Sequence, residues 1–306
     1  MNSPSTRVPL RASLFAIGAG ATWSFGVPLA RSAQHADAWQ YLIWRSIGVI
    51  VVVELLTVLR GEKPRLPKAF TSGAVMQTAT IGLLVASLGF VYAVKNTSAA
   101  NASFLASVTP LAAVFVARFA LGERLNGVTV IAIAVALVGL AITVAGDLEA
   151  GNMIGNIAAL LSAVGFAVYA VCVRSAPEKD WAPVLPGYCF LMVLLCGTVT
   201  IAQGNTLVPP IGDVLLALAH GGILIVAGTL LFNASALKVP AVAMAVFAQT
   251  EMVLAPFWVF LKFGERPKLT TLAGGGLVLA AVIGKAVFDA KEIDVDLRRL
   301  RPRSAQ

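Results

Sequence analysis

Charged residues are scarce in this sequence. Of its 306 residues only 12% are Asp, Glu, Lys or Arg, whereas 58% are hydrophobic. Soluble globular chains carry about 25% charged and about 45–50% apolar residues. With so little charge, a chain of this length could not cover its surface with polar groups in water. The composition therefore excludes an ordinary soluble protein and favours a protein that is solvated by lipid.

Cysteine and histidine are also few. Three cysteines, Cys172, Cys189 and Cys196, lie inside apolar stretches, and the chain has two histidines. This pattern predicts neither a disulfide framework nor a His/Cys metal site. A nucleophile motif and a Gly-rich phosphate-binding loop are missing as well, so we expect no enzyme activity, no cofactor and no ATP-driven transport by this chain alone.

The net charge of +8 would suit a nucleic-acid partner. The basic residues, however, lie in short loops and in the tail, which is typical of the cytoplasmic loops of membrane proteins, so we expect no nucleic-acid binding. Arg7 and Arg11 precede the first apolar run as in a signal peptide. That run continues to Ala30 without a small-x-small cleavage site, so we interpret it as a retained first span.

Apolar windows of about 20 residues, the length that crosses about 30 Å of hydrocarbon, recur along the whole chain. Barrel strands would need only about 10 residues of alternating polarity, so the windows predict helices. The fold class that follows is an all-α integral membrane protein with ten transmembrane helices. The windows are 12–30, 38–59, 71–94, 98–119, 127–146, 152–173, 182–202, 211–236, 239–261 and 269–289.

Lysine and arginine are unevenly divided between the two sides of these spans. The side that holds the N-terminus, the even-numbered loops and the C-terminal end carries 17 of the 23 basic residues, and the opposite side carries five. Since cytoplasmic loops are enriched in Lys and Arg, we predict that both termini face the cytoplasm.

The two halves of the chain resemble one another. A shift of 142 residues places Gly122-Glu123-Arg124 on Gly264-Glu265-Arg266, and a shift of 143 pairs Arg31 with Arg174, each at the end of a span. The predicted units are a first repeat of five spans at 1–147, a second at 148–290 and a basic cytoplasmic tail at 291–306. Because five is odd, the second repeat must be inverted, which is a recurrent plan of secondary transporters.

The stretch from Ala99 to Leu140 is similar to the EamA repeat of the drug/metabolite transporter superfamily, and the second half carries a looser copy in which Met252 stands where the first has Pro110. The motifs that carry the resemblance are Ala102-Ser103-Phe104-Leu105, Thr109-Pro110-Leu111 and Leu121-Gly122-Glu123-Arg124. It implies a carrier of the bacterial inner membrane, with a central cavity lined by spans 1, 3, 4, 6, 8 and 9. Size and plan are similar to those of the YddG-like amino acid exporters, which implies export of amino acids, including aromatic ones, or of related metabolites.

Glu251 is the sharpest candidate for solute or proton binding. It lies about halfway along a predicted span, where a charged side chain costs about 2.5–3.5 kcal/mol on insertion scales and so should face a cavity, find a partner or be protonated. A protonated carboxyl that only joins neighbouring helices is the structural alternative. Protons are thus a candidate partner beside the small-molecule solute and the lipid bilayer.

The other candidates for a substrate cavity are aromatic or neutral polar side chains at intermediate depth, together with a histidine that could titrate near neutrality. They are Trp23, Thr78, Asn101, Ser107, Phe166, Tyr169, His220 and Gln249. For each of them helix packing is the alternative role. Pro110 and Pro256 remove helix hydrogen bonds and are candidate hinges or static kinks.

Two further charged residues lie inside the second span. Arg45 and Glu54 are nine positions apart, nearly 2.5 helical turns, so they cannot pair directly, and we expect their side chains to extend towards opposite membrane surfaces.

Three functions remain open at this point. The first is a secondary carrier that works by alternating access, either for amino acids or for another solute of the superfamily such as a drug cation or a nucleotide sugar. An intramembrane enzyme acting on a lipid-linked substrate would need converging acids, histidines or cysteines, for which only Glu251 and His220 offer themselves. A channel or receptor module would need a continuous polar stripe or an extended ligand-binding domain.

Overall fold

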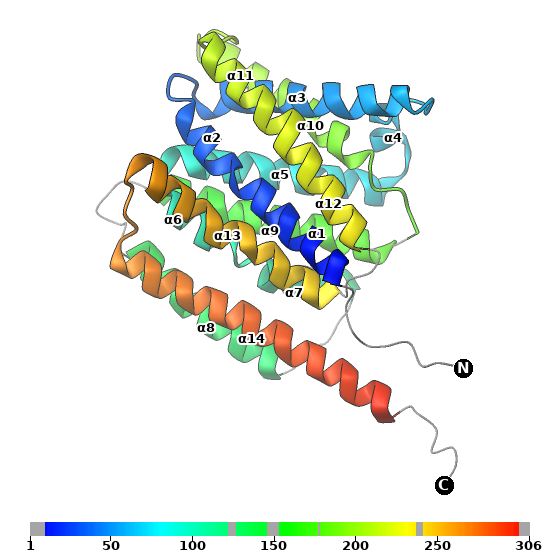
Figure 1. Cartoon of the computed structure of the whole chain (residues 1–306), viewed down its shortest axis with the longest axis vertical. Helices are drawn as coiled ribbons and strands as arrows, with labels where there is room; N and C mark the ends of the chain where they lie inside the picture. The colour runs from blue at the N-terminus through cyan, green and yellow to red at the C-terminus, as the bar shows by residue number, and fades with distance from the viewer. Residues whose placement is uncertain (1–9, 122–126, 146–152, 177, 237–240, 300–306) are drawn as a thin grey trace.

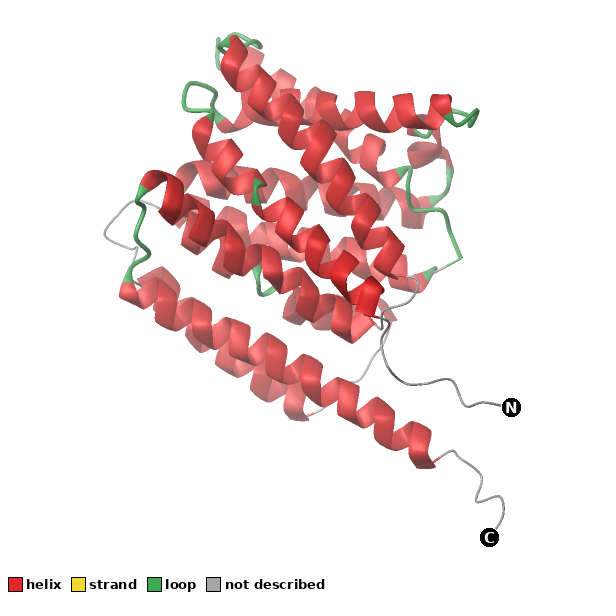
Figure 2. Cartoon of the chain, viewed as in Figure 1, coloured by secondary structure: helices red, strands yellow, loops and turns green. Residues whose placement is uncertain are grey.

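The computed structural model describes residues 10–121, 127–145, 153–176, 178–236 and 241–299, and within these ranges the regular elements are all helices (Figures 1 and 2). The all-helical class is therefore confirmed. In chain order the elements are α1 (Leu10–Ser24), α2 (Gly26–Ser32), α3 (Ala38–Leu59), α4 (Leu66–Thr71), α5 (Ala74–Asn96), α6 (Ala99–Ala106), α7 (Thr109–Leu121), α8 (Gly127–Ala145), α9 (Met153–Ser175), α10 (Val184–Ala202), α11 (Ile211–Ala219), the π-helical segment η2 (His220–Ile225), α12 (Val226–Ala236), α13 (Ala241–Phe263) and α14 (Leu269–Arg299).

Six stretches of the described chain are helical, long and apolar enough to cross a membrane. They are Ala38–Leu59, Ala74–Asn96, Ala99–Ala120, Met153–Val173, Val184–Ala202 and Ile211–Phe232, and each matches a predicted window within a few residues. Shorter apolar helices lie at Val130–Ile142, Val253–Phe263 and Leu269–Gly284, and they overlap three further windows. The remaining window, 12–30, is covered by α1 and α2.

The first span is broken where the sequence predicted one helix. α1 ends at Ser24, Phe25 forms a turn, and α2 begins at Gly26. Pro28 has no backbone N–H, so the carbonyl of Ser24 cannot receive its usual helical hydrogen bond, and the helix breaks one turn before the proline. The Ser24 hydroxyl donates to the carbonyl of Ala21 at 2.6 Å, within the last turn of α1.

The fourth span is broken in the same way. α6 ends at Ala106, and α7 begins at Thr109, one residue before Pro110. The carbonyl that Pro110 leaves without a partner belongs to Ala106, and it accepts a hydrogen bond from the hydroxyl of Thr109 at 2.7 Å. The break is therefore compensated within the chain, as a buried backbone group in lipid requires.

The structure adds helix at two places where the sequence predicted none. Residues Leu66–Thr71, predicted as loop, form α4, and its first backbone N–H groups, those of Arg65 and Leu66, donate to the carboxylate of Glu54. The last helix, α14, continues to Arg299, well into the predicted tail.

The packing of the helices repeats between the two halves. α5 packs along α9, α1 packs along α12 and α13, and α3 packs along α10 and α11. If each span is exchanged for the one five spans away, α5–α9 becomes α12–α1, α1–α13 becomes α9–α7, and α3–α11 becomes α10–α5, all of which are in contact. The pairs α3–α10, α6–α13 and α8–α14 exchange into themselves. The chain thus has a two-repeat architecture.

Glycines let several of these pairs approach closely. A Cβ at Gly82 of α5 would lie 2.8 Å from the carbonyl oxygen of Gly165 in α9, and a Cβ at Gly139 of α8 would lie 2.6 Å from that of Gly274 in α14. Because lipid supplies no hydrophobic drive between helices, small residues at the contact are the usual means of joining them.

Hydrogen bonds and close packing define two ends of the bundle. At the Thr97 end, the segments 31–40, 95–99, 205–213 and 262–265 are joined by polar contacts. At the α4 end, α4 packs against α10, and Lys179 donates to the carbonyl of Ser72. In Figure 1 the start of α1 and the end of α14 lie towards the same side of the bundle. The loop between α13 and α14 lies on the opposite side, at the Thr97 end.

Large apolar side chains cover the outside of the bundle. Phe119 is 86% exposed, Leu269 82%, Leu59 72% and Ile211 71%. A soluble monomer rarely exposes apolar surface on this scale. Together with the six long apolar helices, this surface identifies a multi-pass membrane protein.

Candidate functional site

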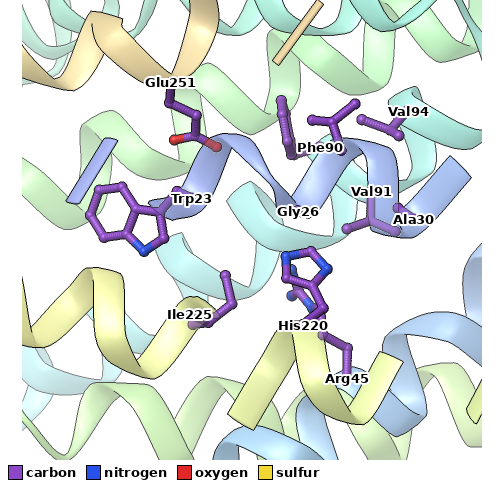
Figure 3. Close-up of a pocket in the computed structure, with 11 residues that line it drawn as sticks. Trp23, Gly26, Ala30, Arg45, Phe90, Val91, Val94, His220, Ile225 and Glu251 are labelled. Atoms are coloured by element: carbon purple, nitrogen blue, oxygen red, sulfur yellow. The ribbon is translucent and has the colours of Figure 1, made fainter. Parts of the chain in front are cut away.

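A small cavity lies between the two halves of the chain. It has a volume of about 40 Å³, which is room for a few water molecules. The first repeat contributes α1, α2, α3 and α5, and the second contributes η2 and α13 (Figure 3). The lining residues are Trp23, Gly26, Val27, Ala30, Arg45, Phe90, Val91, Val94, His220, Ile225 and Glu251.

Three of the nine predicted cavity residues line this space: Trp23, His220 and Glu251. They come from spans 1, 8 and 9, as the family resemblance implied. Span 2 also contributes a lining residue, Arg45, although the family resemblance did not place span 2 at the cavity. Spans 4 and 6 supply none of the residues that line this cavity.

Arg45 is the charged lining residue that the sequence analysis missed, because we expected it to extend towards a membrane surface. The structure corrects this expectation, since Arg45 is only 4% exposed and lines the cavity. Its guanidinium donates to the hydroxyl of Ser87 on α5, and its Nε has no hydrogen-bond partner. A Cβ at Gly221 would overlap the carbonyl oxygen of Arg45, so α3 packs directly on η2 and the arginine cannot reach lipid.

The π-helical segment η2 places His220 at the wall of the cavity. Its Nδ1 lies 2.9 Å from the hydroxyl of Tyr41 in α3, and the imidazole packs where a Cβ at Gly26 would overlap it. The wider turn and the pair Gly221-Gly222 allow this close approach of α3. π-Helical turns inside α-helices occur often at functional sites. Sequence patterns gave no sign of the wider turn, because hydropathy does not distinguish it from an α-helix.

Trp23 and Glu251 form the opposite wall. The indole of Trp23 fills the space beside Gly228, where a Cβ would overlap it, and lies 5.6 Å from the ring of Phe232. Glu251 is partly buried on α13 and has no hydrogen bond or ion pair with any described residue. In Figure 3 its carboxylate points into the space between Trp23 and Phe90.

The other predicted cavity residues lie elsewhere. Thr78 is exposed on α5, and Asn101 accepts a hydrogen bond from Thr271 of α14 at 2.7 Å. Ser107 is buried at the α6–α7 break and bonds to the carbonyl of Phe104. The side chain of Gln249 lies outside the described residues.

Phe166 and Tyr169 also lie outside the cavity lining. They pack edge to face on α9, with ring centroids 5.6 Å apart. Phe166 is exposed, and Tyr169 packs against a separate buried cluster that includes Met76 and Val184. Their placement agrees with the packing role that the sequence analysis kept open.

The two hinge candidates differ in their surroundings. Pro110 follows the break between α6 and α7, whereas Pro256 lies inside α13, which continues from Ala241 to Phe263. Their hinge role stays a prediction.

A polar network closes the Thr97 end. Arg31 pairs with Glu265 at 3.6 Å and donates to the carbonyl of Thr97, and the Glu265 carboxylate accepts the backbone N–H of Ala99 at 2.8 Å. Lys95 donates to the carbonyls of the loop after α2, at 3.0 Å for Ala36. The first and second halves are thus joined by charged hydrogen bonds at this end.

Among the residues that the structure describes, no three His, Cys, Asp or Glu side chains are grouped as a metal site would require. The chemistry of the cavity is that of one guanidinium, one carboxylate, one imidazole and an apolar wall. Such a lining, as far as the described residues form it, can bind and orient a small solute.

Comparison with solved structures gives 15 matching chains. One of them, described only as a crystal structure of a protein, is 19% identical, with a TM-score of 0.63, and the match covers 92% of this chain and 98% of that one. At that identity the likeness concerns the fold alone. A comparison with curated proteins gives no match.

The model of the EamA-like transporter family matches twice, at residues 10–145 and again at 153–285. The two matches divide the chain where the helix packing repeats, and together they cover most of its length. The chain therefore belongs to the EamA-like transporter family, a family of membrane transporters within the drug/metabolite transporter superfamily.

Proposed function

We propose that this protein is a secondary carrier that exports amino acids or related small metabolites across the bacterial inner membrane by alternating access. The observation that carries the proposal is the cavity between the two halves, lined from α1, α2, α3 and α5 on one side and from η2 and α13 on the other. Binding between repeats near mid-membrane is the arrangement on which secondary transporters rely.

Ten spans, arranged as two inverted five-helix repeats, are part of the proposal. The breaks at Phe25 and at Ser107-Val108 leave α1–α2 and α6–α7 each as one interrupted crossing, and α11, η2 and α12 form one crossing. With the start of α1 and the end of α14 on the same side of the bundle, an even number of crossings follows (Figure 1). The excess of Lys and Arg assigns that side to the cytoplasm.

Alternating access is favoured by the size of the cavity. At about 40 Å³ it is far smaller than the 300–1,000 Å³ of small-molecule sites, so a solute can bind only when the halves separate. The Thr97 end is held by Arg31, Glu265 and Lys95, which link segments of both halves. Opening of this end would require these contacts to break, and we propose that it forms the external gate.

The cavity also bears on the alternative functions. A buried guanidinium at Arg45 disfavours a drug cation, because like charges repel strongly where water is excluded. A lipid-linked substrate for an intramembrane enzyme would need a wide opening to the bilayer and a nucleophile or acid pair. The cavity is small and its described lining has a single carboxylate, so it does not favour such an enzyme.

Uptake into proteoliposomes tests the proposal. The purified chain should take up at least one labelled amino acid from a broad panel, and an excess of the same unlabelled amino acid inside the vesicles should accelerate uptake by counterflow. Folded protein that moves no member of a panel of amino acids, organic anions and amines would overturn the carrier assignment.

Cysteine labelling of intact cells tests the inverted arrangement. On a background without Cys172, Cys189 and Cys196, a cysteine at position 268 should react with an impermeant reagent, and one at position 126 should react only after the cells are permeabilised. Equal labelling of both positions in intact cells would contradict the inverted repeats.

A further inference from the structure

We propose that Arg45 and Glu251 are the two charged contacts of a zwitterionic solute, with the carboxylate on Arg45 and the ammonium group on Glu251. The inference rests on the proposed carrier function and names the substrate class of the same cavity: a small molecule that carries one carboxylate and one ammonium group close together, as an α-amino acid does.

Arg45 is a buried charge without a counter-charge among the described residues. Only 4% of its surface is exposed. Its guanidinium donates one hydrogen bond, to the neutral hydroxyl of Ser87, and its Nε has no hydrogen-bond partner. Within the described part of the chain no carboxylate lies within ion-pair distance of it. A buried charge without a counter-charge is strongly destabilising, so the site is incomplete without an anion.

The planar shape of the Arg45 guanidinium favours a carboxylate over other anions. A guanidinium presents a planar fork of N–H donors that matches a carboxylate through two parallel hydrogen bonds. With Nη2 on Ser87 and Nε unsatisfied, Arg45 retains donors for an incoming carboxylate. A lysine at the same place would offer a point charge without this geometry.

Glu251 supplies the complementary charge. It lines the same cavity from the other half of the chain, and no described cation pairs with it. Figure 3 shows Glu251 and Arg45 on opposite sides of the α2 segment that contains Gly26. An acid at this place disfavours a dianion such as a phosphate ester, just as Arg45 disfavours a simple amine.

The remaining walls are apolar or neutral. Phe90, Val91, Val94 and Ile225 line the same cavity, and His220 is engaged by Tyr41. A charge that enters such a site gains more from a fixed counter-charge than it would in water. Because Arg45 belongs to the first repeat and Glu251 to the second, a zwitterion would also connect the two halves, which an anion or an amine alone cannot do.

The test uses solutes that differ by one charge. Leucine carries both groups, 4-methylpentanoate lacks the ammonium group, and 3-methylbutylamine lacks the carboxylate. The measurement is competition against uptake of the labelled amino acid that wild-type proteoliposomes transport best, with leucine as the example. The unlabelled amino acid should compete at least 100-fold better than either of its single-charge analogues. Comparable competition by the two analogues would overturn the assignment.

Variants assign the charges to the residues. Arg45→Gln should weaken binding of the amino acid by about 100-fold, so that the amine analogue competes as well as the amino acid does. In Glu251→Gln the carboxylate analogue should compete as well as the amino acid does. Arg45→Lys should restore part of the affinity. The matched control is Arg60→Gln, an exposed arginine at the end of the same helix, which should behave as wild type.

The outcomes separate this inference from the carrier function. A wild type that transports solutes, none of them zwitterionic, would overturn the charge assignment while the carrier function stands. Equal losses for all three solutes in Arg45→Gln, at unchanged protein level and thermal midpoint, would also overturn it. If Arg45→Gln does not fold, the wild-type competition ranking decides the matter alone.

Discussion

The Thr97 end and the central cavity both contain charged side chains, but the two regions treat them differently. At the Thr97 end, Arg31 has Glu265 and the carbonyl of Thr97, and Lys95 has two backbone carbonyls. In the cavity, Arg45 and Glu251 have no charged partner among the described residues. The charges at the Thr97 end are satisfied within the protein, whereas under the proposal made above the two cavity charges are satisfied by the solute.

The largest expected effect concerns the cavity side of this comparison. Glu251→Gln should keep the fold, because the amide is nearly isosteric and removes the cost of a buried charge, yet transport should fall by about 100-fold or lose its dependence on pH. Counterflow exchange measured beside pH-driven uptake in the same vesicles distinguishes the two roles. Intact counterflow with a lost pH response would assign Glu251 to proton coupling, and loss of both would assign it to binding. Wild-type behaviour in both assays would show that the unpaired carboxyl is structural.

The second effect concerns the wall that keeps Arg45 away from lipid. Gly221→Ala should lower the free energy of unfolding by about 1–3 kcal/mol, because the new Cβ overlaps the carbonyl oxygen of Arg45 and α3 must move. Thermal unfolding in detergent measures the loss. Gly197→Ala is the matched control, since a Cβ there meets nothing within 4 Å. A thermal midpoint unchanged by Gly221→Ala would contradict the close α3–η2 packing.

A smaller, size-selective effect is expected at the aromatic wall. Trp23→Ala should weaken transport of bulky apolar amino acids about tenfold relative to small ones, because the indole lines the cavity. Tyr169→Ala serves as the comparison, since Tyr169 packs in a separate cluster and its loss should lower protein level without changing the preference among solutes. A similar size preference in both variants would mean that the solute path extends along α9.

The smallest effect is expected at the Thr97 end. The side chains of Arg31 and Glu265 are 25% and 30% exposed, so water screens their attraction and the pair should contribute at most about 1 kcal/mol. Arg31→Gln and Glu265→Gln should each change the transport rate no more than about fivefold, with the double variant close to either single one. Additive losses in this double-mutant cycle would show that the two residues do not act as a pair.

Much of the fold could be predicted from hydropathy alone. The windows 38–59 and 182–202 agree with Ala38–Leu59 and Val184–Ala202 almost to the residue, because partition into lipid depends on the average of about 20 side chains. Pro110 was predicted as a hinge or kink, and the fourth span is indeed interrupted just before it, whereas the break at Phe25 was not predicted although Pro28 gave a local reason for it. Averaging over a window hides a single missing hydrogen bond.

The candidate site was predicted less well, because it depends on which way single side chains point. Glu251 was found, since a carboxyl at mid-span is rare whatever its direction. Arg45 was equally visible but was assigned to the membrane surface, and only the packing of α3 on Gly221 shows that it cannot reach lipid. Thr78 and Phe166 were chosen by depth, and depth alone does not distinguish a side chain facing the cavity from one on the outside of the bundle.

One measurement tests most directly whether the space between the halves is the solute path. Val94 lines the cavity and is 1% exposed, so Val94→Cys on a cysteine-free background is hidden in the closed structure. We predict that a small impermeant thiol reagent labels this cysteine in active vesicles, and that a transported amino acid slows the labelling. A cysteine at position 268, in the loop between α13 and α14, should be labelled at a rate that the amino acid does not change. Unlabelled Val94→Cys, or labelling that the solute leaves unchanged while transport continues, would contradict this prediction.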